Sequence, residues 1–252
     1  MGVMLRRLEI LPVPGLPEVA PGDDLAGQII EACLTGTYTD ETGLVTPPVG
    51  LAHHDVLVVS QKVVSKAEGR QRMVDPDDPL AHKPLVLEES VRVLRRRGEL
   101  IISETKHGFI CANAGIDRSN VASDVALLLP EDPDRSARRI RDAIRHRTGN
   151  EVAVIVADTF GRPWRRGLTD IALGSAGILP ILDLRGTADA VGRELHVTEV
   201  CIVDELAGAA ELVRGKADGI AVAVIRGVTN EWFAEGSVAE SIVRHPTEDL
   251  FR

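Results

Sequence analysis

The chain has 252 residues, of which 44% are hydrophobic and 27% charged, a composition typical of a globular protein with a sizeable core. Its aromatic residues are only four Phe, two Trp and one Tyr, which argues against a stacking surface for single-stranded nucleic acid. The net charge of −9 argues against general binding of polyanions. We therefore expect no nucleic-acid partner, while a local basic pocket for a small phosphorylated ligand stays open.

The three cysteines, Cys33, Cys111 and Cys201, lie far apart and form no CxxC pair or zinc-type cluster. Such a sparse set is typical of reduced thiols in a cytoplasmic protein. The longest apolar runs, residues 152–157 and 220–225, have the length of strands and are much shorter than a membrane span. We therefore expect a cytoplasmic protein with no membrane partner.

In the first half of the chain, Asp23 and Asp24 mark a helix start and are followed by a periodic apolar face. Residues 35–48 are rich in Thr, Gly and Pro without periodicity, which predicts a long loop. Residues 56–59 predict a buried strand and residues 100–103 a short one. Between them, residues 79–97 predict a helix in their second half, ended by a basic run before a glycine.

In the second half, Asp132 and Pro133 start a helix that Gly149 ends. Residues 151–158 form the clearest buried strand, residues 204–214 predict a helix and residues 220–226 another strand. The Gly-rich apolar stretch that follows residue 167 matches no single element. Because strands and helices mix without regular βαβ alternation, we predict an α+β fold of mixed sheets with flanking helices, arranged in two lobes.

One predicted strand end and one predicted turn carry polar side chains that a buried core does not need. Polar side chains follow the first buried strand, where their donors suit phosphate oxygens, although such residues also end strands in solvent; they are Ser60, Gln61, Lys62, Ser65 and Lys66. Asp117 and Asn120 stand three residues apart in a glycine-containing turn. Their oxygens suit a hard cation or a nucleotide edge, and they equally suit a turn that satisfies its own backbone.

The third polar segment directly follows the clearest strand. Asp158 and Thr159 offer the carboxylate and hydroxyl oxygens that a phosphate-bound Mg²⁺ or Mn²⁺ requires. Three arginines then occur within five residues, Arg162, Arg165 and Arg166. A solvated basic loop is the alternative, but on so acidic a chain this density favours an anion site. The residues alone thus predict a metal-and-phosphate site built on Asp117 and Asp158.

Several well-known catalytic signatures are missing. The sequence contains no GxxxxGK[ST] loop, no GxGxxG that opens a helix after a strand, and no GxSxG nucleophile elbow. The residues considered so far therefore do not name a reaction.

An ordered set of segments nevertheless resembles one family. The segments are GLPEV, GDDLA, LVVSQKVVSKAEGR, CANAGIDRSNV, LLLP, VADTFGRPWRRG, GREL and ADGIAVAVIRG, and the match that they mark runs from about residue 8 to residue 226. In this order and spacing they resemble the coenzyme F420-0:L-glutamate ligase family, the γ-glutamyl ligases of coenzyme F420 biosynthesis. The resemblance implies a γ-glutamyl ligase-like fold with residues 1–252 as one ligase domain. The last residues resemble the point where two-domain actinobacterial members continue into a nitroreductase-like flavin domain.

The resemblance also implies an activity. Family members add L-glutamate to coenzyme F420-0 with GTP and extend the γ-linked tail through an acyl phosphate. The implied cofactors are GTP as co-substrate and Mg²⁺ or Mn²⁺, with K⁺ as a further candidate, and the implied partners are F420-0, L-glutamate and a second copy of the chain. Two alternatives remain: a metal-dependent phosphatase, and a non-catalytic module that binds F420.

Site residues follow from the same resemblance, position by position. The implied metal ligands are Asp117 and Asp158, with Thr159 at a second metal position. The implied GTP-binding set comprises Leu16, Pro17, Glu18, Val19, Ser60, Gln61, Lys66, Asn120, Gly215, Lys216, Ala217 and Asp218. We add Arg162, Arg165 and Arg166 as candidate catalytic residues that clamp the acyl phosphate or substrate carboxylates. The chain departs from archaeal relatives in the 35–48 insertion, in Gln61, where they carry Thr, and in the RGKAD segment.

Overall fold

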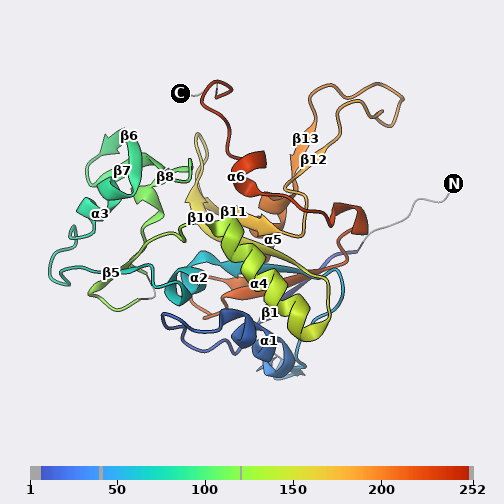
Figure 1. Cartoon of the computed structure of the whole chain (residues 1–252), viewed down its shortest axis with the longest axis horizontal. Coiled ribbons are helices and arrows are strands. Elements are labelled where there is room, and N and C mark those ends of the chain that lie inside the picture. Colours follow the sequence, from blue (N-terminus) through green and yellow to red (C-terminus); the bar gives the residue numbers. More distant parts are fainter. Residues whose placement is uncertain (1–6, 40–41, 120, 250–252) are drawn as a thin grey trace.

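A five-stranded sheet forms the centre of the molecule (Figure 1). The computed structural model describes residues 7–39, 42–119 and 121–249. The strand order is β1-β14-β4-β10-β11, in which β4 and β10 run parallel and every other neighbouring pair is antiparallel. The bounds of the strands are Glu9–Val13 for β1, Val222–Arg226 for β14, Val56–Ser60 for β4, Ala153–Gly161 for β10 and Leu168–Ala176 for β11.

Helices cover both faces of this sheet. In β4, Leu57 and Val59 pack into one apolar cluster, while Val56 and Val58 pack into another on the opposite face. The first cluster includes residues of α1 (Leu25–Thr35) and α4 (Pro133–Thr148), and the second includes residues of α5 (Ile202–Arg214) and α6 (Val238–Ser241). Because successive side chains of a strand alternate between faces, coverage on both sides requires continuous apolar runs such as these.

The two best-marked helices begin as predicted, and the second of them also ends as predicted. Asp24 caps α1, since its Oδ1 accepts a hydrogen bond from the amide of Gly27 at 3.2 Å. Asp132 caps α4 in the same way, and the helix ends at Gly149 with a left-handed φ of 74°. Caps satisfy amides that the first helical turn leaves unpaired, so these local signals fix the helix bounds.

A smaller set of elements lies beside the central sheet, at the left of Figure 1. It contains a three-stranded sheet, a two-stranded sheet and α3, around an apolar cluster of its own that includes Val86, Ile101 and Leu128. The bounds are Lys83–Glu88 for α3, Ser90–Arg97 for β6, Leu100–Thr105 for β7, Ile110–Ala112 for β8, Gln71–Met73 for β5 and Val125–Leu127 for β9. The α+β class is confirmed, and the division into two lobes stays a prediction.

The prediction for residues 79–97 is wrong in its second half. The helix there, α3, ends at residue 88, and the basic run belongs to strand β6, which pairs antiparallel with β7. A two-residue turn joins the strands, and Gly98 adopts a φ of +56° within it. A glycine that can take positive φ closes a hairpin tightly. The arginines therefore lie on the exposed edge strand instead of at a helix end.

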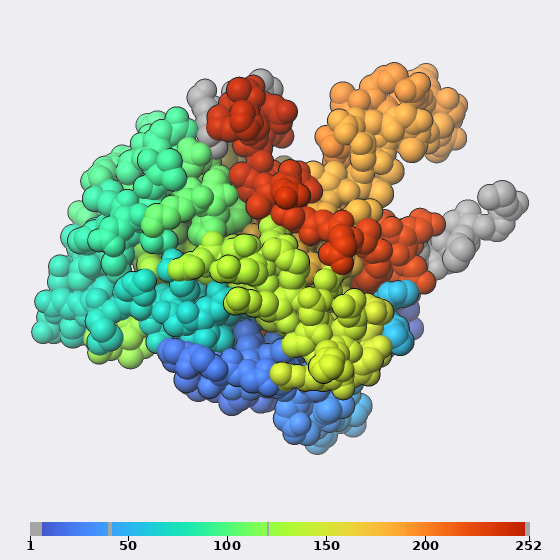
Figure 2. All heavy atoms as spheres, in the orientation of Figure 1, coloured from blue at the N-terminus to red at the C-terminus, as the bar shows by residue number. Residues whose placement is uncertain are grey.

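Two segments contain more structure than the sequence indicated. The predicted loop 35–48 includes the short pair β2 (Tyr38–Thr39) and β3 (Val45–Thr46). The unassigned Gly-rich stretch forms β11 and then β12 (Ile181–Asp183), which pairs with β13 (Glu199–Cys201). The segment between β12 and β13 stands out from the body as an arm (Figure 2).

The remaining elements are the helix α2 (Gln61–Ala67) and two 3₁₀ turns, η1 (Asn113–Gly115) and η2 (Asn230–Trp232). Among the residues that the structure describes, none of the helices combines the length and the apolar character that crossing a membrane requires.

Candidate functional site

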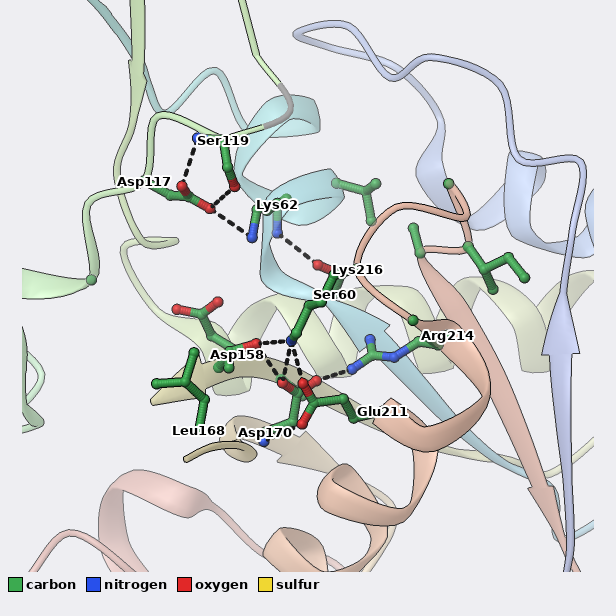
Figure 3. A pocket seen from close by; sticks show the side chains of 18 of the residues that line it. Ser60, Lys62, Asp117, Ser119, Asp158, Leu168, Asp170, Glu211, Arg214 and Lys216 are labelled. Carbon is green, nitrogen blue, oxygen red and sulfur yellow. Dashed lines mark hydrogen bonds and ion pairs between the residues drawn. The ribbon is translucent and has the colours of Figure 1, made fainter. Parts of the chain in front are cut away.

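A polar pocket of about 950 Å³ opens where β4 and β10 end (Figure 3). The two strands are parallel neighbours, with Ala157 opposite Ser60, so their carboxyl ends reach the same edge of the sheet. The rest of the wall comes from residues 16–19, from the segment after η1 and from the turn that follows α5. Segments distant in sequence thus converge at the edge where open sheets with helices on both faces commonly bind ligands.

Asp158 lies in this pocket, just beyond a register shift in β10. Burial raises the pKa of its carboxyl to about 7, and the neighbouring charges of Asp117 and Asp170 act in the same direction. Lys62 opposes this shift through its positive charge, as does a hydrogen bond from the amide of Thr159. A carboxylate in such surroundings favours any ligand or ion that brings positive charge close to it.

Asp117 is held by a lysine and a serine. Its Oδ2 lies 2.6 Å from Nζ of Lys62 and accepts a hydrogen bond from Oγ of Ser119 at 2.9 Å, while Oδ1 accepts one from the Ser119 amide at 2.7 Å. Burial alone would raise the pKa of Asp117, but these contacts outweigh it and lower the pKa. The pKa of Lys62 is raised, since the attraction of Asp117, Asp158 and Asp170 outweighs the effect of its burial.

A second acidic group forms on the hairpin of β10 and β11. Thr159 and Asp170 are cross-strand partners in the antiparallel register, and Oγ1 of Thr159 donates to Oδ1 of Asp170 at 2.5 Å. Glu211 of α5 joins them by accepting a hydrogen bond from the amide of Asp170 at 3.0 Å. Arg214, the last residue of α5, pairs with the other carboxylate oxygen of Asp170.

The ammonium of Lys216 occupies the centre of this group. Its Nζ lies 2.5 Å from Oγ1 of Thr159 and 3.5 Å from Oδ1 of Asp170, and it also pairs with Glu211 (Figure 3). The lysine follows Gly215, which has a φ of +59° that other residues rarely adopt. The turn after α5 therefore brings a tethered cation to a position surrounded by oxygen atoms.

An ion pair at the pocket joins two residues that the sequence analysis placed in the same nucleotide-binding set. Nζ of Lys66 lies 2.6 Å from Oε1 of Glu18, with the lysine nearly buried and the glutamate exposed. Lys66 lies on α2 and Glu18 in the loop after β1, so the contact closes one side of the pocket.

The structure brings most of the predicted site residues into one pocket. Those that line it are Leu16, Pro17, Glu18, Val19, Ser60, Lys66, Asp117, Asp158, Thr159, Gly215, Lys216 and Ala217. Gln61 instead lies buried within α2, where its Oε1 accepts a hydrogen bond from Ser65 at 2.9 Å. Asp218 folds over Gly215, so that a Cβ there would lie 2.1 Å from its Oδ2. Asn120 lies outside the described residues.

The three arginines predicted to clamp an anion do not line the pocket. Arg162, Arg165 and Arg166 occupy the exposed turn between β10 and β11, where Nη2 of Arg162 donates to the carbonyl oxygen of Arg166 at 2.9 Å. The hairpin carries them beyond the end of the sheet. Their proposed role in binding substrate stays a prediction.

Sequence reasoning missed three charged residues of the pocket, Asp170, Glu211 and Arg214, which all line it. Lys62, which the sequence had placed among the donors after the first buried strand, lines it too. Glu211 and Arg214 stand three apart at the end of a predicted helix, a spacing that places side chains on one face. Asp170 can be recognised as a pocket residue only once strand β11 is identified and its register with β10 is known.

The oxygen-bearing side chains of the pocket fit a hard cation that also binds phosphate. Among residues 7–39, 42–119 and 121–249, no three His, Cys, Asp or Glu side chains converge as a complete protein-made metal site would require. Mg²⁺ is commonly held by one or two carboxylates together with ligand phosphates and water. Two pairs of carboxylates in the pocket match that pattern, Asp117 with Asp158 and Asp170 with Glu211. The ammonium of Lys216 lies beside the second pair, so a positive charge is favoured at that position.

The fold and the pocket define a class of protein: an α+β chain whose polar pocket suits an anionic ligand together with a hard cation. Its sequence matches the model of the F420-0:gamma-glutamyl ligase family over residues 15–227, and the chain belongs to that family.

Three relatives carry the name coenzyme F420:L-glutamate ligase. The one from Methanopyrus kandleri is 39% identical, over 98% of this chain and 99% of its own length. The one from Methanothermobacter thermautotrophicus is 38% identical, over 97% and 99%. The one from Methanocaldococcus jannaschii is 41% identical, over 79% and 84%.

Proposed function

We propose that this protein is a GTP-dependent ligase that adds L-glutamate to coenzyme F420-0 and extends the γ-linked glutamate tail. The observation that carries the proposal is the pocket at the ends of β4 and β10, in which Asp117, Asp158 and Thr159 converge with Ser60 and Lys66. Family membership and the names of the relatives supply the reaction class.

In the proposed reaction, a carboxylate oxygen of F420-0 attacks the γ-phosphorus of GTP and GDP leaves. The amine of L-glutamate then attacks the acyl carbon, an amide bond forms, and inorganic phosphate departs with a proton lost from the amine. Asp117 and Asp158 would hold Mg²⁺ or Mn²⁺, with Thr159 at a second position and K⁺ a further candidate. The divalent ion would supply charge neutralisation on the phosphate oxygens.

The chain's own residues would bind and orient the reactants. Lys62 and Lys66 both lie on α2, the first partly buried and the second buried, and their ammonium groups can donate to phosphate oxygens. Residues 16–19 and the turn 215–217 both line the pocket and would enclose the nucleotide. The exposed arginines 162, 165 and 166 would then meet substrate carboxylates outside the pocket.

One incubation tests the activity. Purified protein with GTP, Mg²⁺ or Mn²⁺, L-glutamate and F420-0 should yield glutamylated product, detected by mass spectrometry. Asp117→Ala and Asp158→Ala should each abolish product formation while circular dichroism shows an intact fold. Asp183→Ala is the matched control, since Asp183 lies outside the pocket and pairs with Arg185. Full turnover in either pocket variant would contradict the metal assignment.

The alternatives give different results in the same assay. A metal-dependent phosphatase would release phosphate without any need for L-glutamate or an acceptor carboxylate. A non-catalytic module would bind F420 tightly in calorimetry and show no binding of GTP. Assembly as a homodimer also stays a proposal from the family resemblance, and light scattering of the purified chain measures it directly.

A further inference from the structure

The strongest unexplained feature of the pocket is the guanidinium of Arg214. The residue ends α5, lines the pocket and is 5% exposed. Its Nη2 pairs with Asp170, but no acceptor among the described residues lies within hydrogen-bonding distance of Nε or Nη1. Figure 3 shows one terminal nitrogen directed at Asp170 and the other turned away from that carboxylate.

Such an arrangement is unfavourable for a purely structural arginine. A guanidinium carries five N–H donors, and buried donors without acceptors forfeit the hydrogen bonds they made to water. Most buried polar groups in proteins have partners, so an exception in a pocket indicates a group that a ligand completes. Burial lowers the pKa of Arg214, whereas Asp170 and Glu211 act to raise it. A second anion beside the guanidinium would favour its charged form further.

The surroundings of Arg214 select the class of ligand. Beside it lie the turn 215–217 and the cation position formed by Thr159, Asp170 and Glu211. A phosphate group offers oxygens to a guanidinium and to a cation at the same time, which a single carboxylate of an amino acid does less readily. Asp170 would keep the guanidinium in place through Nη2, leaving Nη1 for the ligand.

We propose that Arg214 binds a phosphate oxygen of the guanine nucleotide through its unpaired nitrogens. It thereby provides inside the pocket the arginine contact that the exposed hairpin residues 162, 165 and 166 do not. The inference deepens the proposed function and rests on the use of GTP there. Arg214 is thus a binding residue for the nucleotide, and Asp170 is the residue that positions it.

Calorimetric titration with GTP in the presence of Mg²⁺ tests this. Charged hydrogen bonds are worth enough that Arg214→Met should weaken GTP binding about 10- to 100-fold. Arg214→Lys preserves the ion pair with Asp170 but loses the extra donors, and it should weaken GTP binding about tenfold. Affinity for guanosine, which has no phosphate, should be unchanged in both variants, a result that general damage to the pocket would not give.

Two controls keep the outcome decisive. Arg139→Met removes an exposed arginine of α4 that does not line this pocket, and GTP affinity should be unchanged. Urea unfolding identifies any variant that is not folded, and Arg214→Lys is the variant that preserves the buried charge pair.

Each result bears on one statement. Unchanged GTP affinity in folded Arg214→Lys and Arg214→Met would overturn the inference while leaving GTP use intact. A loss confined to L-glutamate binding would overturn it as well, by assigning Arg214 to a substrate carboxylate. If the unaltered protein bound no GTP, the proposed function would fail at that step and the inference would fail with it.

Discussion

Replacing Asp158 by asparagine should stabilise the folded chain at alkaline pH and have little effect at low pH. The pKa of this carboxyl rises from its ordinary value of 3.8 to about 7, chiefly because of burial. Between these two values the folded chain holds a proton on Asp158 that the unfolded chain has released. Stability therefore falls as pH rises through this window, and the full cost of the buried charge is reached above pH 7.

The size of the effect follows from the width of the window. Each pKa unit corresponds to about 1.4 kcal/mol, so the cost is about 1.7 kcal/mol at pH 5 and at most about 4.5 kcal/mol at pH 8. Asp158 lies on the wall of a pocket and is not fully enclosed, so solvent reduces these values. Asparagine has no charge to bury and lacks this dependence.

Urea unfolding of both proteins at pH 5 and pH 8, with EDTA to remove metal ions, measures the difference. The advantage of Asp158→Asn should grow by 1 kcal/mol or more between the two pH values. Asp183→Asn is the matched control: hydrogen bonds from Arg185 lower the pKa of the exposed Asp183 from 3.8 to about 2, so the effect of that substitution should be the same at pH 5 and pH 8. An Asp158→Asn advantage that stays constant with pH would refute the reasoning.

Three further outcomes follow from the structure. Lys216→Met should strengthen Mn²⁺ binding about tenfold in an EPR titration, because it frees the oxygens that now surround the ammonium. Gly174→Ala should destabilise the fold by about 3 kcal/mol in urea, because its Cβ would lie 2.2 Å from the backbone carbon of Pro133. The cysteines should resist a disulfide reagent at pH 8 until the chain is unfolded, since burial raises the pKa of each thiol to about 12; they are Cys33, Cys111 and Cys201.

Matched variants check the first two of these outcomes. Lys106→Met removes a lysine of similar exposure, 57% against 59% for Lys216, that pairs with Glu89 away from the pocket. Equal Mn²⁺ affinity in the two variants would contradict competition by Lys216. Gly161→Ala places a Cβ in open space and should leave stability unchanged, so an equal loss there would exclude the steric explanation. Rapid labelling of the folded chain would contradict the thiol prediction.

The sequence predicted the elements whose signals are local. The caps Asp24 and Asp132 and the stop at Gly149 act within a few residues of the helices they bound, so α1 and α4 could be recognised directly. The apolar runs of β4, β10 and β14 likewise indicate strands buried on both faces. Strand β6 escaped recognition because its basic residues fit a helix end until the turn at Gly98 and the pairing with β7 are known.

In the candidate site, too, the residues with local signals were predicted and those that depend on long-range contacts were not. Asp117, Asp158 and Thr159 stand in recognisable motifs after strands and turns, so the sequence by itself indicated a site for a cation and an anion, and resemblance named the family. The cross-strand register that sets Asp170 opposite Thr159, and the approach of the end of α5, are long-range and leave no local pattern. Only the tertiary structure therefore decided that Arg214 lies inside the pocket while the hairpin arginines lie outside it, because side-chain contacts between distant segments depend on how the sheet and helices pack.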